Sequence, residues 1–195
     1  MRILETFRRL MGKALNSQES DGDAAEQGST KEMRSIVIMQ RKAYRFGKEE
    51  LQAAGERGWG KKFDGTEDPM YFVSADNPAL TVVKAGSHII RLTCMAGRYS
   101  EDDDYALSQL PQPEQKKAWT EHHACAFLEF LNDLSGGSRI ADAAAYASLA
   151  KLALQLGDPN CAAVFLPMKD MMFPNDGTAE QGMRLLVKAE LPLKR

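Results

Sequence analysis

Cysteine is scarce in this sequence. Three cysteines occur among 195 residues, namely Cys94, Cys125 and Cys161, and no two of them form a Cys-x-x-Cys pair. The chain therefore offers neither a disulfide framework nor a thiolate zinc site, and we expect three small buried thiols. We predict no metal and no cofactor.

Long hydrophobic runs are absent as well. No apolar stretch approaches the roughly 20 residues that a membrane-spanning helix needs. The N-terminus lacks the apolar region and the cleavage site of a secretory signal peptide. These two absences predict a cytoplasmic protein.

The motifs that most directly indicate an enzyme are missing. The sequence has no Gly-x-Ser-x-Gly, His-Glu-x-x-His, Gly-x-x-x-x-Gly-Lys-Ser/Thr or Gly-x-Gly-x-x-Gly pattern. Only His88, His122 and His123 are available to a mechanism that rests on imidazole. The absences favour a binding protein over an enzyme.

An excess of charge of either sign is also lacking. The 25 lysines and arginines nearly balance the 27 aspartates and glutamates, which leaves a net charge of −2. Neutralising the phosphates of a nucleic acid takes a basic face, so we do not expect nucleic acid as a partner.

The apolar pattern divides the chain into three regions. Residues 1–15 predict an amphipathic helix, with Arg2, Arg8, Arg9 and Lys13 on its polar face. Its apolar face carries Ile3, Leu4, Phe7, Leu10 and Met11. Such a basic helix suits an anionic membrane surface, a groove on a partner or a second copy, or its own domain. Residues 16–33 are polar and predict a flexible linker, and residues 34–195 predict a single domain.

Within that domain, strands and helices are expected in a mixed order. Strands are predicted at residues 35–41, 122–133 and 161–167, with a further short strand and a hairpin that turns at 85–87. Helices are predicted at 47–58, 114–119, 138–156 and 178–191, and an exposed acidic loop at 101–115. This order predicts an α+β fold, in which helices pack on one face of a mainly antiparallel sheet, as in ferredoxin-like folds.

One segment, Glu-His-His-Ala-Cys-Ala-Phe, could carry catalytic side chains. Period-two alternation places Glu121, His123 and Cys125 on the same side of a strand. A base beside a thiol could generate a thiolate, and these residue types also ligate metals. The alternative is a strand with a polar start at the sheet rim. A small hydrolase or transferase is thus the second functional hypothesis.

A methionine-rich segment supports the first functional hypothesis, a binding surface for a partner. Met168, Met171, Met172 and Phe173 lie between Pro167 and Pro174, just after a predicted strand. Flexible thioethers suit an adaptable binding surface, and a loop position favours exposure. The alternative is that these side chains fold back and cap the core. We predict a non-enzymatic interaction domain that contacts an unknown protein partner, or a second copy of itself, through this segment.

Two stretches resemble a known family. They are AWTEHHACAFLEFLND at residues 118–133 and AAAYASLAKLALQLGDPNCAAVFLP at residues 143–167. A tryptophan ahead of a strand that starts with histidines, a long Ala/Leu helix and a Cys/Ala/Val strand ending in proline are similar to the bacterial domain of unknown function 4261. The resemblance covers residues 35–186 and implies a compact α+β domain. It implies no catalytic residue.

Overall fold

The computed structural model describes residues 33–77, 80–133, 140–157 and 159–189. The helix predicted for residues 1–15 and nearly all of the predicted linker lie outside these residues. The start predicted at Ser138 for the long Ala/Leu helix lies outside them too.

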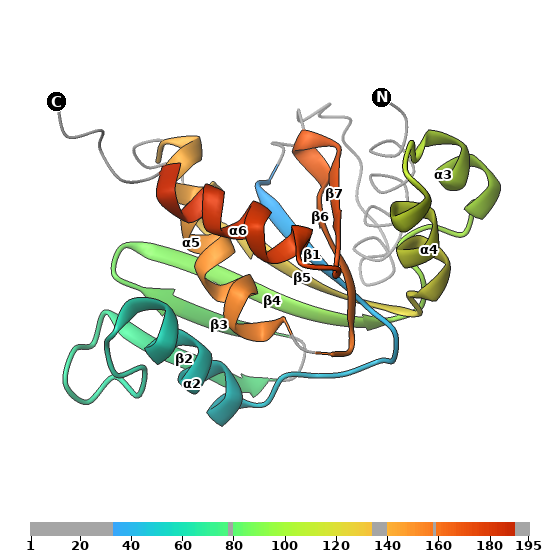
Figure 1. The fold of residues 1–195 in the computed structure, drawn as a ribbon. Coiled ribbons are helices and arrows are strands. Elements are labelled where there is room, and N and C mark those ends of the chain that lie inside the picture. Colours follow the sequence, from blue (N-terminus) through green and yellow to red (C-terminus); the bar gives the residue numbers. More distant parts are fainter. Residues whose placement is uncertain (1–32, 78–79, 134–139, 158, 190–195) are drawn as a thin grey trace, which may run out of the picture.

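The domain is built on a seven-stranded sheet of order β2-β3-β4-β5-β1-β6-β7, in which neighbouring strands pair antiparallel (Figure 1). The strands are β1 (Ser35–Gln40), β2 (Tyr71–Asn77), β3 (Leu80–Ala85), β4 (His88–Ala96), β5 (Ala124–Phe130), β6 (Cys161–Leu166) and β7 (Met171–Pro174). The helices are α2 (Lys48–Trp59), α3 (Asp103–Gln109), α4 (Pro113–Glu121), α5 (Asp142–Leu156) and α6 (Thr178–Ala189), with short 3-10 turns η2 (Leu131–Asp133) and η3 (Pro167–Lys169). The predicted α+β class is confirmed.

The centre of the sheet follows the expected ferredoxin-like plan. Strands β4, β5, β1 and β6 are consecutive in the sheet, and β1 lies between the two strands that flank α5 in sequence. With α2 and α5 they form the β-α-β-β-α-β arrangement of such folds. Three additions extend this plan. The β2–β3 hairpin is inserted between α2 and β4, and helices α3 and α4 are inserted between β4 and β5. Strand β7 extends the sheet at the edge opposite β2.

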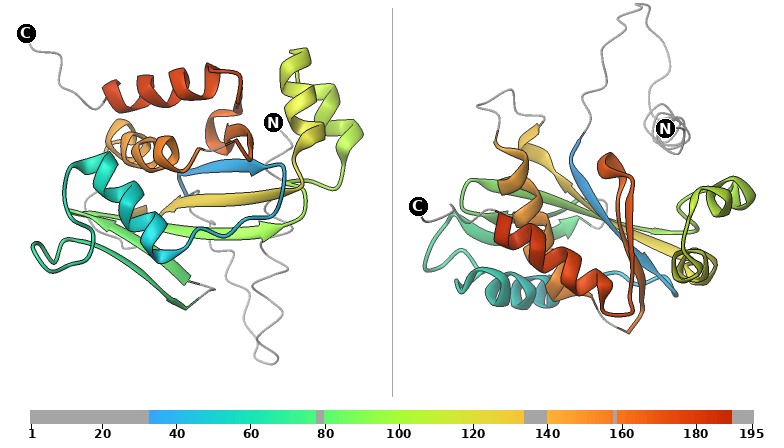
Figure 2. Two further views of the ribbon diagram at one scale, coloured as in Figure 1. Left: turned by 60° about the horizontal axis from the view of Figure 1, so that its bottom comes forward. Right: turned by 45° about the horizontal axis from the view of Figure 1, so that its top comes forward.

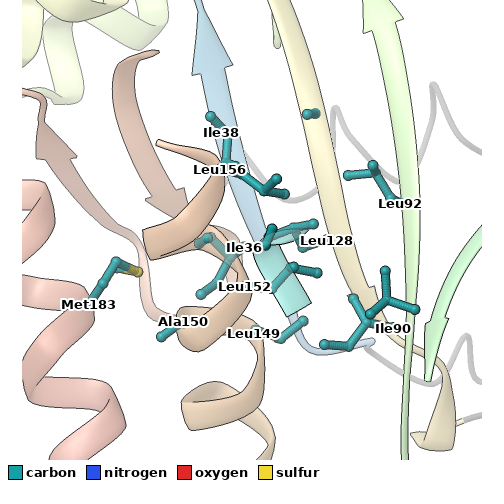
Figure 3. Close-up of a cluster of buried hydrophobic side chains, with 14 of the residues drawn as sticks. Ile36, Ile38, Ile90, Leu92, Leu128, Leu149, Ala150, Leu152, Leu156 and Met183 are labelled. Carbon is teal, nitrogen blue, oxygen red and sulfur yellow. The ribbon is translucent and has the colours of Figure 1, made fainter. Parts of the chain in front are cut away.

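The main core lies between one sheet face and the helices α2, α5 and α6 (Figures 1 and 2). Helix α5 is its centre, because nine of its fifteen residues are buried. Leu149 and Leu152 of α5 lie beside Ile36, Leu128 and Ile90 of three neighbouring strands (Figure 3). The sequence prediction of a central Ala/Leu helix is therefore confirmed. In the described part of the chain, no helix is long and apolar enough to cross a bilayer.

A second core covers part of the opposite sheet face, so the expectation of helices on one face only is wrong. Val37, Phe127 and Phe165 project from β1, β5 and β6 into this cluster, where Ala106 of α3 and Trp119 of α4 pack on them. Helices α3 and α4 lie apart from the other three helices (Figure 2).

The acidic segment at 101–115 was also expected to be a loop, whereas most of it is helical. Helix α3 begins after Asp102, whose carboxylate accepts a hydrogen bond from the Tyr105 amide at 3.0 Å. Such a cap satisfies one of the free N–H groups of the first turn. Acidic residues in a first turn also interact favourably with the helix dipole. The run of carboxylates is therefore a helix start.

Other boundaries differ from the predictions as well, among them the limits of β5 and α4. Helix α2 does not close on Gly58 but continues to Trp59, because Gly60 adopts a left-handed conformation (φ 65°) and its N–H caps the Glu56 carbonyl at 2.8 Å. Helix α5 begins at Asp142, later than predicted.

Gly55 and Gly58 provide a matched stability test within α2. A Cβ at Gly55 would lie 2.6 Å from Cδ1 of the fully buried Phe63, whereas at Gly58 it would lie 3.5 Å from the Lys151 carbonyl oxygen. We expect Gly55→Ala to destabilise the fold by roughly 1–3 kcal/mol through overpacking. Gly58→Ala should be neutral or stabilising by up to about 1 kcal/mol, because alanine is the better helix former. Urea unfolding measures both, and equal effects would contradict the packing of Phe63 against α2.

Candidate functional site: a groove at the sheet edge

A groove of about 430 Å³ lies between the α3–α4 pair and the edge strand β7. Its volume falls within the roughly 300–1,000 Å³ range of ligand pockets. Trp119, Phe165 and Met172 contribute to the second core and also line the groove. The other lining residues are Ala106, Gln109, Leu110, Pro111, Gln112, Gln115, Asp170, Met171, Phe173, Pro174 and Thr178.

The methionine-rich segment forms one wall of this groove, although it is not the loop that the prolines suggested. Residues 171–174 form strand β7 and pair with β6. Met171 is 46% exposed, whereas Met172 is only 6% exposed and belongs to the second core. Phe173 is half-buried against the main core. Met168, in η3, is half-buried and is not a lining residue. Met171 is therefore exposed, as a binding surface requires, whereas Met172 caps the core, as the alternative predicted. Partner binding stays a prediction.

The position of the helical wall is fixed by a polar cluster around Trp119. The Trp119 indole N–H donates to the Asp103 carboxylate at 2.9 Å, which joins α4 to α3. Arg98 lies 3.2 Å from the same carboxylate and donates a hydrogen bond to the Trp119 carbonyl at 2.6 Å. The Tyr99 ring packs edge-on to Trp119 at a centroid distance of 6.3 Å. These contacts hold the indole against the groove.

His122 is the buried hinge between α4 and β5. It follows the last residue of α4, and its side chain is fully buried. The ring accepts a hydrogen bond from the Tyr99 amide at Nε2, at 3.0 Å, so Nδ1 carries the proton that is donated to the Trp119 carbonyl. Burial is the main cause that lowers the His122 pKa to about 4, and the ring is therefore neutral near pH 7.

The strand wall is tied to the helical wall by Gln115. Its amide donates a hydrogen bond from Nε2 to the Met172 carbonyl at 3.0 Å. At the far end of β7, the Thr178 hydroxyl donates to the Pro174 carbonyl at 3.0 Å. Proline has no N–H to donate. The edge of β7 is thus partly closed by side chains of its own domain.

The lining of the groove suits binding better than catalysis. Its floor is aromatic and aliphatic, and its polar groups are three glutamine amides, the Thr178 hydroxyl and the Asp170 carboxylate. No cysteine, histidine, lysine or arginine is among the described lining residues. The groove can bury apolar side chains and form hydrogen bonds at its rim. The Thr178 hydroxyl on its lining is engaged locally, 2.7 Å from the Asp176 carboxylate and 3.0 Å from the Pro174 carbonyl oxygen.

The three catalytic candidates Glu121, His123 and Cys125 do not share a strand face, contrary to the prediction. Glu121 is the last residue of α4, and its carboxylate is 3.1 Å from Nε of Arg41. His123 is exposed and precedes β5, where its amide donates to the Gln40 carbonyl at 2.8 Å. Cys125 is on β5 and faces the second core. Glu121 therefore belongs to the end of α4, because the backbone becomes extended at His122 (φ −81°, ψ 140°) before β5 begins.

Cys125 has the electrostatics of a structural thiol. Burial raises its pKa to about 12, so the thiol stays protonated near neutral pH. Burial is also the main cause of the raised pKa of Cys94. Among the described residues, no group of three His, Cys, Asp or Glu side chains could hold a metal ion.

His88, the first residue of β4, contacts helix α5. Its Nδ1 lies 2.6 Å from the Ser148 hydroxyl on α5, and its ring packs on Phe130 at 5.4 Å. Ser148 is 1% exposed. This pair joins β4 to α5 within the main core region.

Sequence reasoning missed α3, whose Ala106 and Gln109 line the groove but fall in the segment predicted as a loop. Most of α4 was predicted, as a helix at 114–119. Its true start is one residue earlier, where Pro113 occupies the first turn, a position that proline favours.

Comparisons of the chain with protein-family models, with curated proteins and with solved structures find no match. The resemblance to the domain of unknown function 4261 stays a prediction.

His122 predicts a pH dependence of stability. Its pKa is about 4 in the fold, against about 6.5 in an unfolded chain, so the unfolded state binds more protons between these values. Stability should fall as the pH drops from about 6.5 to about 4, by at most about 3 kcal/mol. Urea unfolding at about pH 7 and about pH 4.5 measures this loss.

The control is His122→Gln, whose amide can also donate and accept a hydrogen bond but does not titrate. The variant should lose less stability on acidification than the wild type. Equal losses in the two proteins would show that His122 does not titrate as described.

Proposed function

We propose that this protein is a non-enzymatic interaction domain whose groove binds an amphipathic helical segment with a basic polar face. The observation that carries this proposal is the apolar groove at the sheet edge, with Met171 exposed on one wall. Helix-in-groove recognition buries anchor side chains spaced three, four and seven residues apart. A flexible thioether at the rim can adapt to such anchors.

The hydrogen bonds at β7 support a helical ligand over an extended one. An added strand would need free backbone groups along the sheet edge. The carbonyls of Met172 and Pro174 already accept side-chain hydrogen bonds, and Pro174 lacks an N–H. A helix satisfies its own backbone groups and needs only the apolar surface.

The charge of the helical wall supports a basic ligand. Between Arg98 and Glu121, the segment that contains α3 and α4, six carboxylates outnumber three basic residues, which are Arg98, Lys116 and Lys117. Two of these bases are paired within the segment, Arg98 with Asp103 and Lys117 with Glu121. The neighbouring Lys169 lies 5.5 Å from the Tyr146 ring of α5, on the main-core side. Such a field attracts a basic helix and repels phosphate groups.

The alternative, a hydrolase or transferase that uses Glu121, His123 and Cys125, has no supporting contact. Glu121 is paired with Arg41, and the raised pKa of Cys125 opposes thiolate formation.

The test uses two synthetic 15-residue peptides of leucine and lysine, one with amphipathic helical order and one with the same residues scrambled. The ordered peptide should bind the full-length protein, and the scrambled peptide should not. Met171→Asp should weaken binding about tenfold, because it places a charge on the apolar rim. Isothermal titration calorimetry measures the affinities.

Leu185→Asp is the matched control. Leu185 is 67% exposed on α6 and is not a lining residue, so this variant should bind like the wild type. Equal weakening by the two substitutions, or no preference for the ordered peptide, would contradict the proposed groove.

A further inference from the structure

We infer that the groove is occupied by residues 1–15 of the same chain, which a partner helix must displace. This inference rests on the proposed function, because it names a resident ligand for the same groove. The segment has the chemistry that the groove selects, with an apolar face and a basic face predicted by its sequence.

The start of β1, where the described chain begins, lies toward this edge of the domain. Strand β1 pairs antiparallel with β6, with Val37 opposite Phe165. The start of β1 is therefore at the same end of the sheet as the end of β6. Leu166, at the end of β6, pairs with Met171 at the start of β7, and Met171 and Asp170 line the groove. The chain enters β1 near one end of the groove.

The length of the connection allows the segment to reach the groove without strain. Residues 16–32 provide a polar connection of 17 residues. A flexible chain of that length has a root-mean-square span of about 20–25 Å. A tether of this kind holds its ligand at an effective concentration in the millimolar range. Even a weak contact is then populated within one molecule.

The two surfaces are complementary in charge and polarity. The N-terminal segment has four basic residues and one carboxylate, Glu5. The basic residues are Arg2, Arg8, Arg9 and Lys13. The α3–α4 wall carries the excess of carboxylates. Phe7 is near the middle of the predicted apolar face and is the natural anchor for the floor formed by Trp119, Phe165 and Met172. The contact therefore buries apolar side chains while its charges meet at the rim.

An occupied groove gives the domain a built-in competitor. A partner helix must displace residues 1–15. Its apparent association constant is therefore the intrinsic constant multiplied by the fraction of molecules in which the groove is open. Displacement also frees a basic amphipathic segment. Binding of a partner helix is thus coupled to dissociation of residues 1–15 from the groove.

The test uses the full-length protein labelled with 5-fluorotryptophan, and fluorine NMR reports the environment of Trp119. The chain has two tryptophans, and Trp59→Phe identifies the Trp119 signal. Phe7→Asp should shift this signal by removing the anchor from the groove. Leu185→Asp, which adds the same charge on α6 away from the groove, should leave the signal unchanged. A synthetic peptide of residues 1–15 added to the Phe7→Asp protein should restore the wild-type signal.

Affinity for the ordered leucine–lysine peptide separates this inference from the function on which it rests. Phe7→Asp should bind that peptide at least about tenfold more tightly than the wild type. Equal affinities with an unchanged Trp119 signal would overturn the inference but leave the groove as a binding site. If neither protein binds the peptide, the proposed function fails as well.

Dilution distinguishes docking within one chain from exchange between two copies. The Trp119 signal of the wild type should not change on dilution, and light scattering should give the mass of a monomer. A signal that changes on dilution together with a dimer mass would assign the segment to a second copy and overturn docking within the chain.

Discussion

The burial of β1 on both faces is the constraint on which the rest of the domain depends. All six residues from Ser35 to Gln40 are buried, and β5 and β6 on either side are buried along their whole length too. A strand with two apolar faces needs a cover on each face, because neither face can remain in water without losing the free energy of burial. Helices α5 and α6 supply one cover, and α3 and α4 contribute to the other.

That constraint explains how much of the fold could be predicted. The runs SIVIMQ and CAAVFL indicate buried strands, and the Ala/Leu pattern of α5 indicates a central helix, because these signals are local. Continuous apolar runs also imply cover on both faces, which a prediction of one helical layer ignores. Helix α3 was missed because its acidic start resembles a loop, whereas Asp102 caps it. Whether a carboxylate caps a helix or remains in solvent depends on packing that sequence spacing does not fix.

The candidate site was predicted in part for the same reason. The composition of residues 168–173 drew attention to the edge of the sheet where the groove lies, but the alternation of exposed Met171 and buried Met172 follows from the pairing of β7 with β6. Similarly, nothing in the pair His122-His123 tells which ring is buried. The difference arises because α4 ends at Glu121, which turns His122 inward to meet the Tyr99 amide and leaves His123 exposed. Glu121, His123 and Cys125 alternate in the sequence, but the change from helix to strand at His122 separates Glu121 from the other two.

The groove exists because two requirements of the fold meet at its edge. The sheet needs aromatic cover at Phe165, and Trp119 and Tyr99 supply it from one side. The edge strand also needs protection from pairing with other chains, and the Gln115 amide and Pro174 supply that protection. Neither device fills the space between the α3–α4 pair and β7, so an apolar groove lies beside a partly closed backbone edge. The proposed preference for a helical ligand follows from this combination, because a helix satisfies its own backbone groups and needs only the apolar surface.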